Sequence, residues 1–114
     1  ENELARATHA QISYNLHLYW DAIEDYNKLI DLAPSKIAYR TGRADAFYAT
    51  KSWEKAAEDY SMALDISPGQ PEVYIRLGVA KYESGDQKSA CYWWRKALHY
   101  KHPEANQYLY QYCR

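Results

Sequence analysis

Residues 72–98, EVYIRLGVAKYESGDQKSACYWWRKAL, decide the fold of this chain of 114 residues. Apolar residues recur at helical spacing on both sides of Gly85, which is typical of a helix, a turn and a second helix. Ala90 ends a column of evenly spaced alanines, after Ala22 and Ala56. Their spacing defines a repeat period of about 34 residues, which indicates stacked helix–turn–helix units, because each unit buries its apolar face on a neighbour.

Small residues also recur at the repeat period in the first helix of each unit, as Ala10, Ala44 and Gly78. Small residues that face one another let two helix axes approach to about 8–10 Å, so we expect both small columns at the contact within each helix pair. Large side chains are expected to fill the space between layers: Tyr26, Phe47, Tyr60, Leu77 and Trp94.

Turn residues set the boundaries of the predicted helices. Pro34 and Pro68 end two helices, because proline lacks a backbone N–H and disfavours helix in the residue before it. Ser35 and Ser52 are predicted N-caps of the third and fourth helices, and Gly85 is a predicted left-handed stop. Helices are therefore predicted at 3–15, 19–32, 36–49, 53–66, 70–83, 87–100 and 104–113.

Composition narrows the class of protein. Hydrophobic residues make up 47% of the chain, which is normal for a folded domain. The net charge is −1, so we expect no nucleic-acid partner. No apolar run approaches the length needed to span a bilayer, so we expect a soluble chain without membrane insertion. Aromatic residues reach 16%, with thirteen Tyr and one Phe, and tyrosine suits both a core edge and a recognition surface.

These residues resemble the tetratricopeptide repeat, or TPR. The resemblance rests in the third unit on Tyr74, Leu77, Gly78, Tyr82, Gly85, Asp86, Ala90, Trp94, Ala97 and Leu98. In the second unit it rests on Ala44, Phe47, Trp53, Ala56, Tyr60, Ala63, Leu64 and Pro68. The first unit matches from Ala22 to Pro34, but His9 and Ser13 replace an expected aliphatic and an expected aromatic residue. Residues 90–109 also resemble the related Sel-one-like repeats.

The resemblance implies an all-α fold, a right-handed α-α superhelix of three helix–turn–helix repeats and a seventh capping helix. The single domain would cover residues 1–114, with repeats at about 3–34, 35–68 and 69–102 and the cap at about 103–114. The resemblance covers nearly the whole chain. Whether these units are the whole domain or part of a longer array stays open.

The resemblance also implies a concave groove lined by the first helices. The residues at the lining positions are Thr8, Gln11, Tyr14, Asn15, Thr41, Asp45, Tyr48, Glu72, Ile75, Arg76, Val79, Tyr82 and Glu83, and Tyr110 is expected to close one end. Tyr14, Tyr48 and Tyr82 are spaced by the repeat period and are predicted to form a ladder along the wall. Such rings suit a bound peptide segment. The alternative is that they pack neighbouring layers and do not contact a ligand.

One TPR subclass grips the C-terminal carboxylates of heat-shock chaperones with a clamp of Lys, Asn, Asn, Lys and Arg. The matching positions here hold Ala7, Gln11, Gly42, Glu72 and Arg76. Arg76 alone keeps the residue type, and Glu72 would repel a carboxylate. We therefore expect this domain not to bind a chaperone C-terminal tail. Arg76 is expected to pair with Asp45, with Glu83 or with an acidic group of a ligand.

The two cysteines, Cys91 and Cys113, have two interpretations. In antiparallel packing the start of the sixth helix lies beside the end of the seventh, so the two thiols are expected within bonding range. A disulfide would stabilise the fold by about 3 kcal/mol and would pin the capping helix in an oxidising compartment, periplasmic or secreted. In the cytoplasm the same residues would be reduced, small buried thiols.

Candidate chemistry elsewhere is sparse. His99 and His102 are three residues apart, but no third or fourth ligand is near in sequence, so two surface histidines are the favoured interpretation. We expect no catalytic residue, no metal and no cofactor. The sequence favours a module that binds a protein or peptide of unknown identity. One alternative is a structural scaffold that acts through its convex face or open repeat edge, including self-association. Another is an enzyme or a ligand-binding accessory domain, for which the sequence offers no constellation of residues.

Overall fold

The computed structural model describes residues 2–114, and over these residues the chain forms seven helices and no strand. They are α1 (Glu3–Asn15), α2 (Tyr19–Leu32), α3 (Ile37–Ala49), α4 (Trp53–Ile66), α5 (Pro71–Glu83), α6 (Gln87–His99) and α7 (Ala105–Tyr112). Each bound lies within one residue of the range predicted from the sequence. The all-α repeat fold is confirmed.

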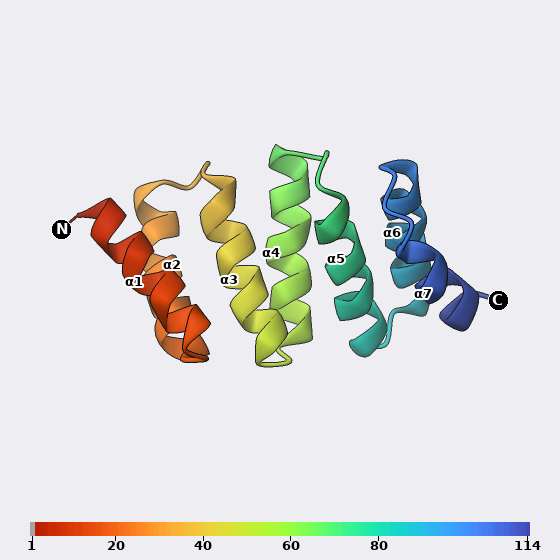
Figure 1. Cartoon of the computed structure of the whole chain (residues 1–114), viewed down its shortest axis with the longest axis horizontal. Helices are drawn as coiled ribbons and strands as arrows, with labels where there is room; N and C mark the ends of the chain where they lie inside the picture. The colour runs from red at the N-terminus through yellow and green to blue at the C-terminus, as the bar shows by residue number, and fades with distance from the viewer. Residues whose placement is uncertain (1) are drawn as a thin grey trace.

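The helices pack in chain order. The pairs α1–α2, α3–α4 and α5–α6 are joined through contacts of α2 with α3 and of α4 with α5, and α7 packs on α6. They form a row from the N-terminus to the C-terminus (Figure 1), and the molecule measures 50 × 24 × 19 Å. An elongated body of this kind follows from units that bury their apolar faces on their neighbours along the chain.

The alanine columns lie at the helix contacts, as predicted. Ala22, Ala56 and Ala90 are fully buried, and so are Ala10 and Ala44 in the first helices. These five small residues therefore lie in the core, whereas Gly78, the third member of the first-helix column, lies against the indole of Trp94. The larger residues assigned to the space between layers are also buried: Tyr26, Phe47, Tyr60, Leu77 and Trp94.

In each of the first two units, a buried aspartate on the second helix binds an arginine on the first helix. Asp25 accepts a hydrogen bond from Arg6 Nη1 at 2.9 Å. Asp59 occupies the same position of the second unit and accepts two hydrogen bonds from Arg43, through Nε and Nη2, each at 2.8 Å. Paired donors of this geometry offset the cost of removing a carboxylate from water, which would otherwise destabilise the fold.

The third unit uses aromatic rings at the same register. In the second unit, Arg40 Nη1 also lies 3.9 Å from Asp59 Oδ1. The corresponding residues of the third unit are Tyr74 and Trp93, whose stacked ring centroids lie 5.8 Å apart. Tyr74 also stacks on Tyr100 at 5.2 Å. The third unit thus replaces an ion pair by apolar contact, which needs no buried charge.

One left-handed residue ends the first helix of every unit. His17, Lys51 and Gly85, which occupy the same position of the three units, have φ values of 64°, 61° and 98°. The predicted stop at Gly85 is confirmed. The predicted cap at Ser35 is wrong, because Lys36 occupies the N-cap position of α3. Ser52 occupies the N-cap position of α4, as predicted, but its side chain makes no cap hydrogen bond.

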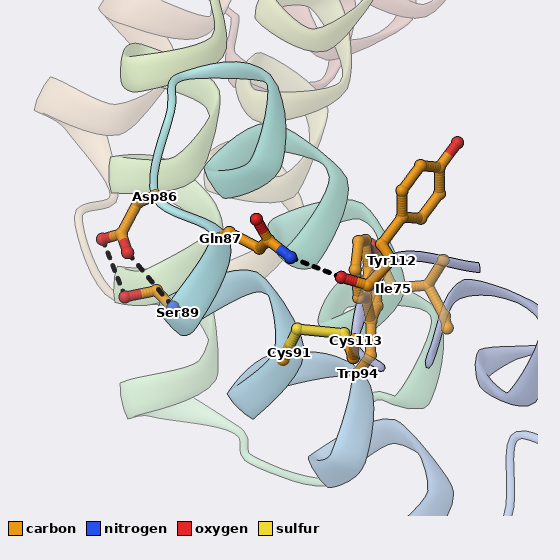
Figure 2. Close-up of a disulfide and its surroundings, with 8 residues drawn as sticks. All are labelled: Ile75, Asp86, Gln87, Ser89, Cys91, Trp94, Tyr112 and Cys113. Carbon is orange, nitrogen blue, oxygen red and sulfur yellow. Dashed lines mark hydrogen bonds between the residues drawn. A yellow bond between two sulfur atoms is a disulfide. The ribbon is translucent and has the colours of Figure 1, made fainter. Parts of the chain in front are cut away.

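The short helix α7 covers the end of the row and is tied to α6 (Figure 2). A disulfide joins Cys91, near the start of α6, to Cys113, which follows α7, with their Cα atoms 5.9 Å apart. Gln87 Nε2 donates to the carbonyl oxygen of Tyr112. The ring of Tyr108 stacks on Trp94 with centroids 5.1 Å apart, so α7 shields that indole from water.

Two kinds of feature are absent from residues 2–114. None of the helices is long and apolar enough to cross a membrane. No three His, Cys, Asp or Glu side chains within this described part of the chain gather where they could hold a metal ion.

Candidate binding groove

The centre of the predicted groove is an ion pair between α3 and α5. Arg76 Nη1 donates to Asp45 Oδ1 at 2.8 Å. The hydroxyl of Tyr60, from α4, donates to the same oxygen at 2.5 Å. The guanidinium carbon of Arg76 also lies 5.4 Å from the ring centroid of Tyr48. Of the three partners that the sequence left open for Arg76, the structure supplies Asp45.

In this cluster the guanidinium of Arg76 stays charged, and the tyrosine hydroxyls stay protonated. Burial opposes the charge of Arg76, but the hydrogen bond with Tyr60 and the charge of Asp45 outweigh it and raise the pKa of the guanidinium. Burial, followed by the charge of Asp45, raises the pKa of the Tyr60 hydroxyl. The same two causes raise the pKa of Tyr14. The wall therefore holds one fixed cation among hydroxyl donors.

Two hollows flank Arg76. One, of about 220 Å³, is lined by Thr41, Asp45, Tyr60, Gln70, Glu72, Val73 and Arg76. The other, of about 200 Å³, is lined by Glu72, Ile75, Arg76, His102 and Glu104. Arg76 and Glu72 border both hollows, so a ligand in either one meets a positive and a negative group. The side chain of Arg76 is 42% exposed and is accessible from solvent despite its partner.

The three tyrosines of the predicted ladder pack against other aromatic rings and are also partly exposed to solvent. Tyr14 lies edge-on to Tyr19 at 5.4 Å, and Tyr48 lies edge-on to Trp53 at 5.2 Å. Tyr82 contacts the ring of Tyr112 at 4.5 Å and is 36% exposed. Each ring thus supports the helix packing, as the alternative interpretation held, and leaves part of its surface open.

The remaining predicted residues differ in exposure. Thr8, Gln11, Asn15, Glu83 and Tyr110 are exposed, and Thr41 and Val79 are half-buried. Ile75 is buried in the core, where its carbonyl oxygen accepts a hydrogen bond from Trp94 Nε1, so its side chain gives the groove little surface. Tyr110 carries the guanidinium of Arg114 over its ring at 4.4 Å.

The polar role of Tyr60 was not predicted from the sequence. Its ring fills the space between layers, as expected, and its residue is fully buried. Its hydroxyl, however, reaches Asp45 and helps to fix the position of Arg76. A signal was present, because a buried tyrosine usually has a hydrogen-bond partner for its hydroxyl, whereas a phenylalanine needs none.

Known proteins resemble this chain in sequence and in fold. A family profile described as TPR repeat matches residues 44–85. The heat-shock protein cognate co-chaperone sgt12 of Aspergillus fumigatus is 36% identical over 72 residues, which cover 63% of this chain and 21% of that protein. The chain thus spans about a fifth of the length of this curated relative.

Solved structures show the same architecture. The Sgt2 TPR domain from Aspergillus fumigatus has a TM-score of 0.77 and 27% identity, covering 87% of this chain and 66% of that one. The first TPR of Spaghetti (RPAP3), bound to the HSP90 peptide SRMEEVD, has a TM-score of 0.89 and 22% identity, covering 97% and 90%. At 22% identity, the likeness to the first TPR of Spaghetti (RPAP3) shows the fold alone.

The prediction that excluded chaperone C-terminal tails is wrong, because TPR domains with this fold include the two RPAP3 domains bound to an HSP90 peptide. Taken one position at a time, Ala7, Gln11, Gly42 and Glu72 all differ from the clamp residues. The tertiary structure gathers other polar residues around the hollow beside Arg76, among them Thr41 and Gln70. Residue types at five positions do not decide which class of peptide a wall of this kind accepts.

Proposed function

We propose that this chain, a tetratricopeptide-repeat domain and a protein–protein interaction module, binds a short acidic peptide along the wall around Arg76. The observation that carries the proposal is the position of Arg76, fixed by Asp45 and Tyr60 between two hollows while its side chain stays 42% exposed. An acidic C-terminal segment such as the HSP90 peptide SRMEEVD, bound by the RPAP3 domain, has the matching charge. The proposed role is binding without catalysis, in keeping with the co-chaperone relative.

Preorganisation supports this role for Arg76. A flexible arginine loses conformational freedom when it binds a carboxylate, and that loss weakens the interaction. Here Asp45 and the ring of Tyr48 already hold the guanidinium in place. A peptide carboxylate needs only to approach the exposed side of an ordered cation. Glu72 acts in the opposite direction, because its negative charge borders the same hollows.

The experiment uses the peptide SRMEEVD with a fluorophore at its N-terminus and measures binding by fluorescence anisotropy. Arg76→Gln is expected to weaken binding about tenfold or more, since it removes a charge-assisted contact. Glu72→Gln is expected to strengthen binding severalfold. Lys55→Gln, which removes an exposed positive charge from α4, is the matched control and should leave the affinity unchanged.

Two results would contradict the proposal. One is equal affinity of the parent domain and the Arg76→Gln variant for the peptide. The other is the absence of binding by a domain whose circular dichroism spectrum shows it to be folded. A peptide in which Gln and Asn replace Glu and Asp should bind weakly to every variant, because the proposed contact depends on its negative charge.

The tyrosine ladder is proposed to supply contact area for the peptide backbone. Truncation to alanine would also remove packing, because Tyr48 contacts both Trp53 and Tyr60. Tyr82→Leu is the sharper test, since Tyr82 is the more exposed ring and leucine keeps an apolar side chain over Trp94. The variant should bind SRMEEVD more weakly while its melting temperature changes little. Unchanged affinity would remove Tyr82 from the site.

A further inference from the structure

The outer face of α6 carries a charge opposite to that of the earlier second helices. Its solvent-facing positions are Lys88, Tyr92, Arg95, Lys96 and His99. The equivalent positions of the second unit, on α4, are Glu54, Glu58, Ser61, Met62 and Asp65. The corresponding positions on α2 are Trp20, Glu24, Asn27, Lys28 and Asp31. One register of the repeat is thus acidic in the first two units and basic in the third.

The basic groups of this face have no carboxylate partner in the described structure. Arginines of the earlier helices are paired, as Arg6 is with Asp25 and Arg43 with Asp59. Within residues 2–114, no ion pair within 4.0 Å involves Lys88, Arg95 or Lys96. Helix α6 itself contains no acidic residue, and Glu104 is the one acidic residue after position 86. The cations of this face are therefore not engaged in direct ion pairs within the described part of the chain.

An exposed aromatic ring lies in the middle of the basic face. Tyr92 is 50% exposed, and the Nζ atom of Lys96 lies 5.7 Å from its ring centroid. The ring is held edge-on against Trp93 with centroids 4.9 Å apart, and Trp93 is stacked on Tyr74. Tyr92 therefore presents a supported apolar surface flanked by cations. Tyrosine and arginine are enriched among the residues that contribute most to binding at protein interfaces.

We propose that the outer face of α6 is a second binding surface, for an acidic segment of a partner protein. From Lys88 to His99 the helix rises about 17 Å, which matches roughly five residues of extended peptide. Carboxylates of such a segment would contact the basic side chains, and an apolar residue between them would rest on Tyr92. The surface lies on the second helix of the unit, whereas the proposed groove lies on the first helices, so the two sites are independent.

Other anionic partners fit this face less well. A nucleic-acid duplex would extend over α4, where Glu54, Glu58 and Asp65 would repel its phosphates. An interfacial membrane helix buries a row of large apolar side chains, whereas this face offers the ring of Tyr92 among charged groups. A short acidic segment satisfies the charge of α6 without reaching α4.

The test uses a fluorescein-labelled octaglutamate peptide and fluorescence anisotropy. The parent domain should bind it, with an affinity that falls as salt is added. The triple variant Lys88→Glu, Arg95→Glu, Lys96→Glu should bind at least about tenfold more weakly, because like charges replace opposite ones. The matched control, Lys28→Glu, Lys51→Glu, Lys55→Glu, has the same net charge but leaves α6 intact, and it should bind as the parent does.

Amide chemical shifts separate this surface from the groove. Addition of octaglutamate should shift resonances of residues 87–99, and Arg76→Gln should leave these shifts of α6 unchanged. Shifts confined to the surroundings of Arg76, or equal weakening in both triple variants, would overturn the proposal. So would binding of phosphatidylserine vesicles by α6 without binding of octaglutamate. All of the substituted side chains are at least partly exposed, and melting curves should show that both triple variants fold.

Discussion

The indole of Trp94 in α6 lies directly against Gly78 in α5. A Cβ atom added at Gly78 would stand 2.3 Å from Nε1 of that indole and 2.5 Å from its Cδ1. The ring cannot turn away freely, because Nε1 donates to the carbonyl oxygen of Ile75 at 3.2 Å and Tyr108 stacks on the ring. The absence of a side chain at position 78 is therefore a condition for the packing of the third unit.

Gly78→Ala should destabilise the domain by about 1–3 kcal/mol through overpacking, although alanine favours helix more than glycine does. Urea denaturation followed by circular dichroism measures the change. Gly69→Ala is the control, since no atom lies within 4 Å of the added Cβ there and the stability should change little. A stable Gly78→Ala variant with unaltered tryptophan fluorescence would contradict this account.

Ala56→Leu should cost roughly 1–3 kcal/mol, because Ala56 is fully buried in α4, which packs on α3. Ala38→Leu, at an exposed position of α3, serves as the comparison and should leave the free energy of unfolding almost unchanged. Thermal melts of both variants decide the matter. An unchanged melting temperature for Ala56→Leu would show that the two helices do not meet there.

Lys51→Gly should stabilise the domain by up to about 1 kcal/mol, because Lys51 has a φ of 61° and a residue with a Cβ is strained in that region. The corresponding residue of the third unit is already Gly85. Ala49→Gly, in the last turn of α3, should have the opposite effect, since it only adds freedom to the unfolded chain. Denaturant midpoints that rank the two variants in the other order would refute the argument.

The cap of α6 should lose its effect in acid. Asp86 accepts hydrogen bonds from the hydroxyl and the backbone N–H of Ser89, and these bonds lower its pKa below 3.8. Because the folded pKa is depressed, the stabilisation is complete above pH 3.8 and disappears as the pH falls through the lowered value. The melting temperature of the parent should drop toward that of Asp86→Asn in this window. A constant difference between the two would argue against ionisation of Asp86 as the cause.

The disulfide between Cys91 and Cys113 should be visible in solution as the absence of free thiols. Thiol counting in denaturant should give none before reduction and two afterwards. Reduction should lower the stability by about 3 kcal/mol, because the bond closes a loop across 22 residues, and a compartment that keeps thiols reduced would open it. The double variant Cys91→Ala, Cys113→Ala should not respond to reductant. Two thiols before reduction would refute the bond.

Local patterns predicted most of the helices because their causes are local. Proline excludes helix before Pro34 and Pro68, and both helices end where expected. Capping was harder, since serine near a helix start becomes a cap only when its hydroxyl points at a free N–H. At Ser52 the hydroxyl lies instead 3.0 Å from that of Thr50. A contact of this kind depends on the turn geometry and leaves no mark in the residue types.

The candidate groove was predicted less completely. The repeat period placed Tyr48, Asp45 and Arg76 on first helices, which is a matter of counting. The repeat period could not show whether Arg76 pairs with Asp45 or with Glu83. That choice depends on how α3 and α5 are placed relative to one another. The rejection of chaperone tails failed for a related reason, since it judged single positions without the neighbours that share their wall.

The sequence by itself determined that this chain is a row of paired helices, because the constant repeat period presents the same buried face in every unit and each face requires the next. It also identified the small residues that are buried where the helices meet. Only the tertiary structure decided that Tyr60 from α4 shares one oxygen of Asp45 with Arg76, and that α7 is held over Trp94. Those contacts join residues far apart in the chain, and their formation depends on side-chain directions that packing sets.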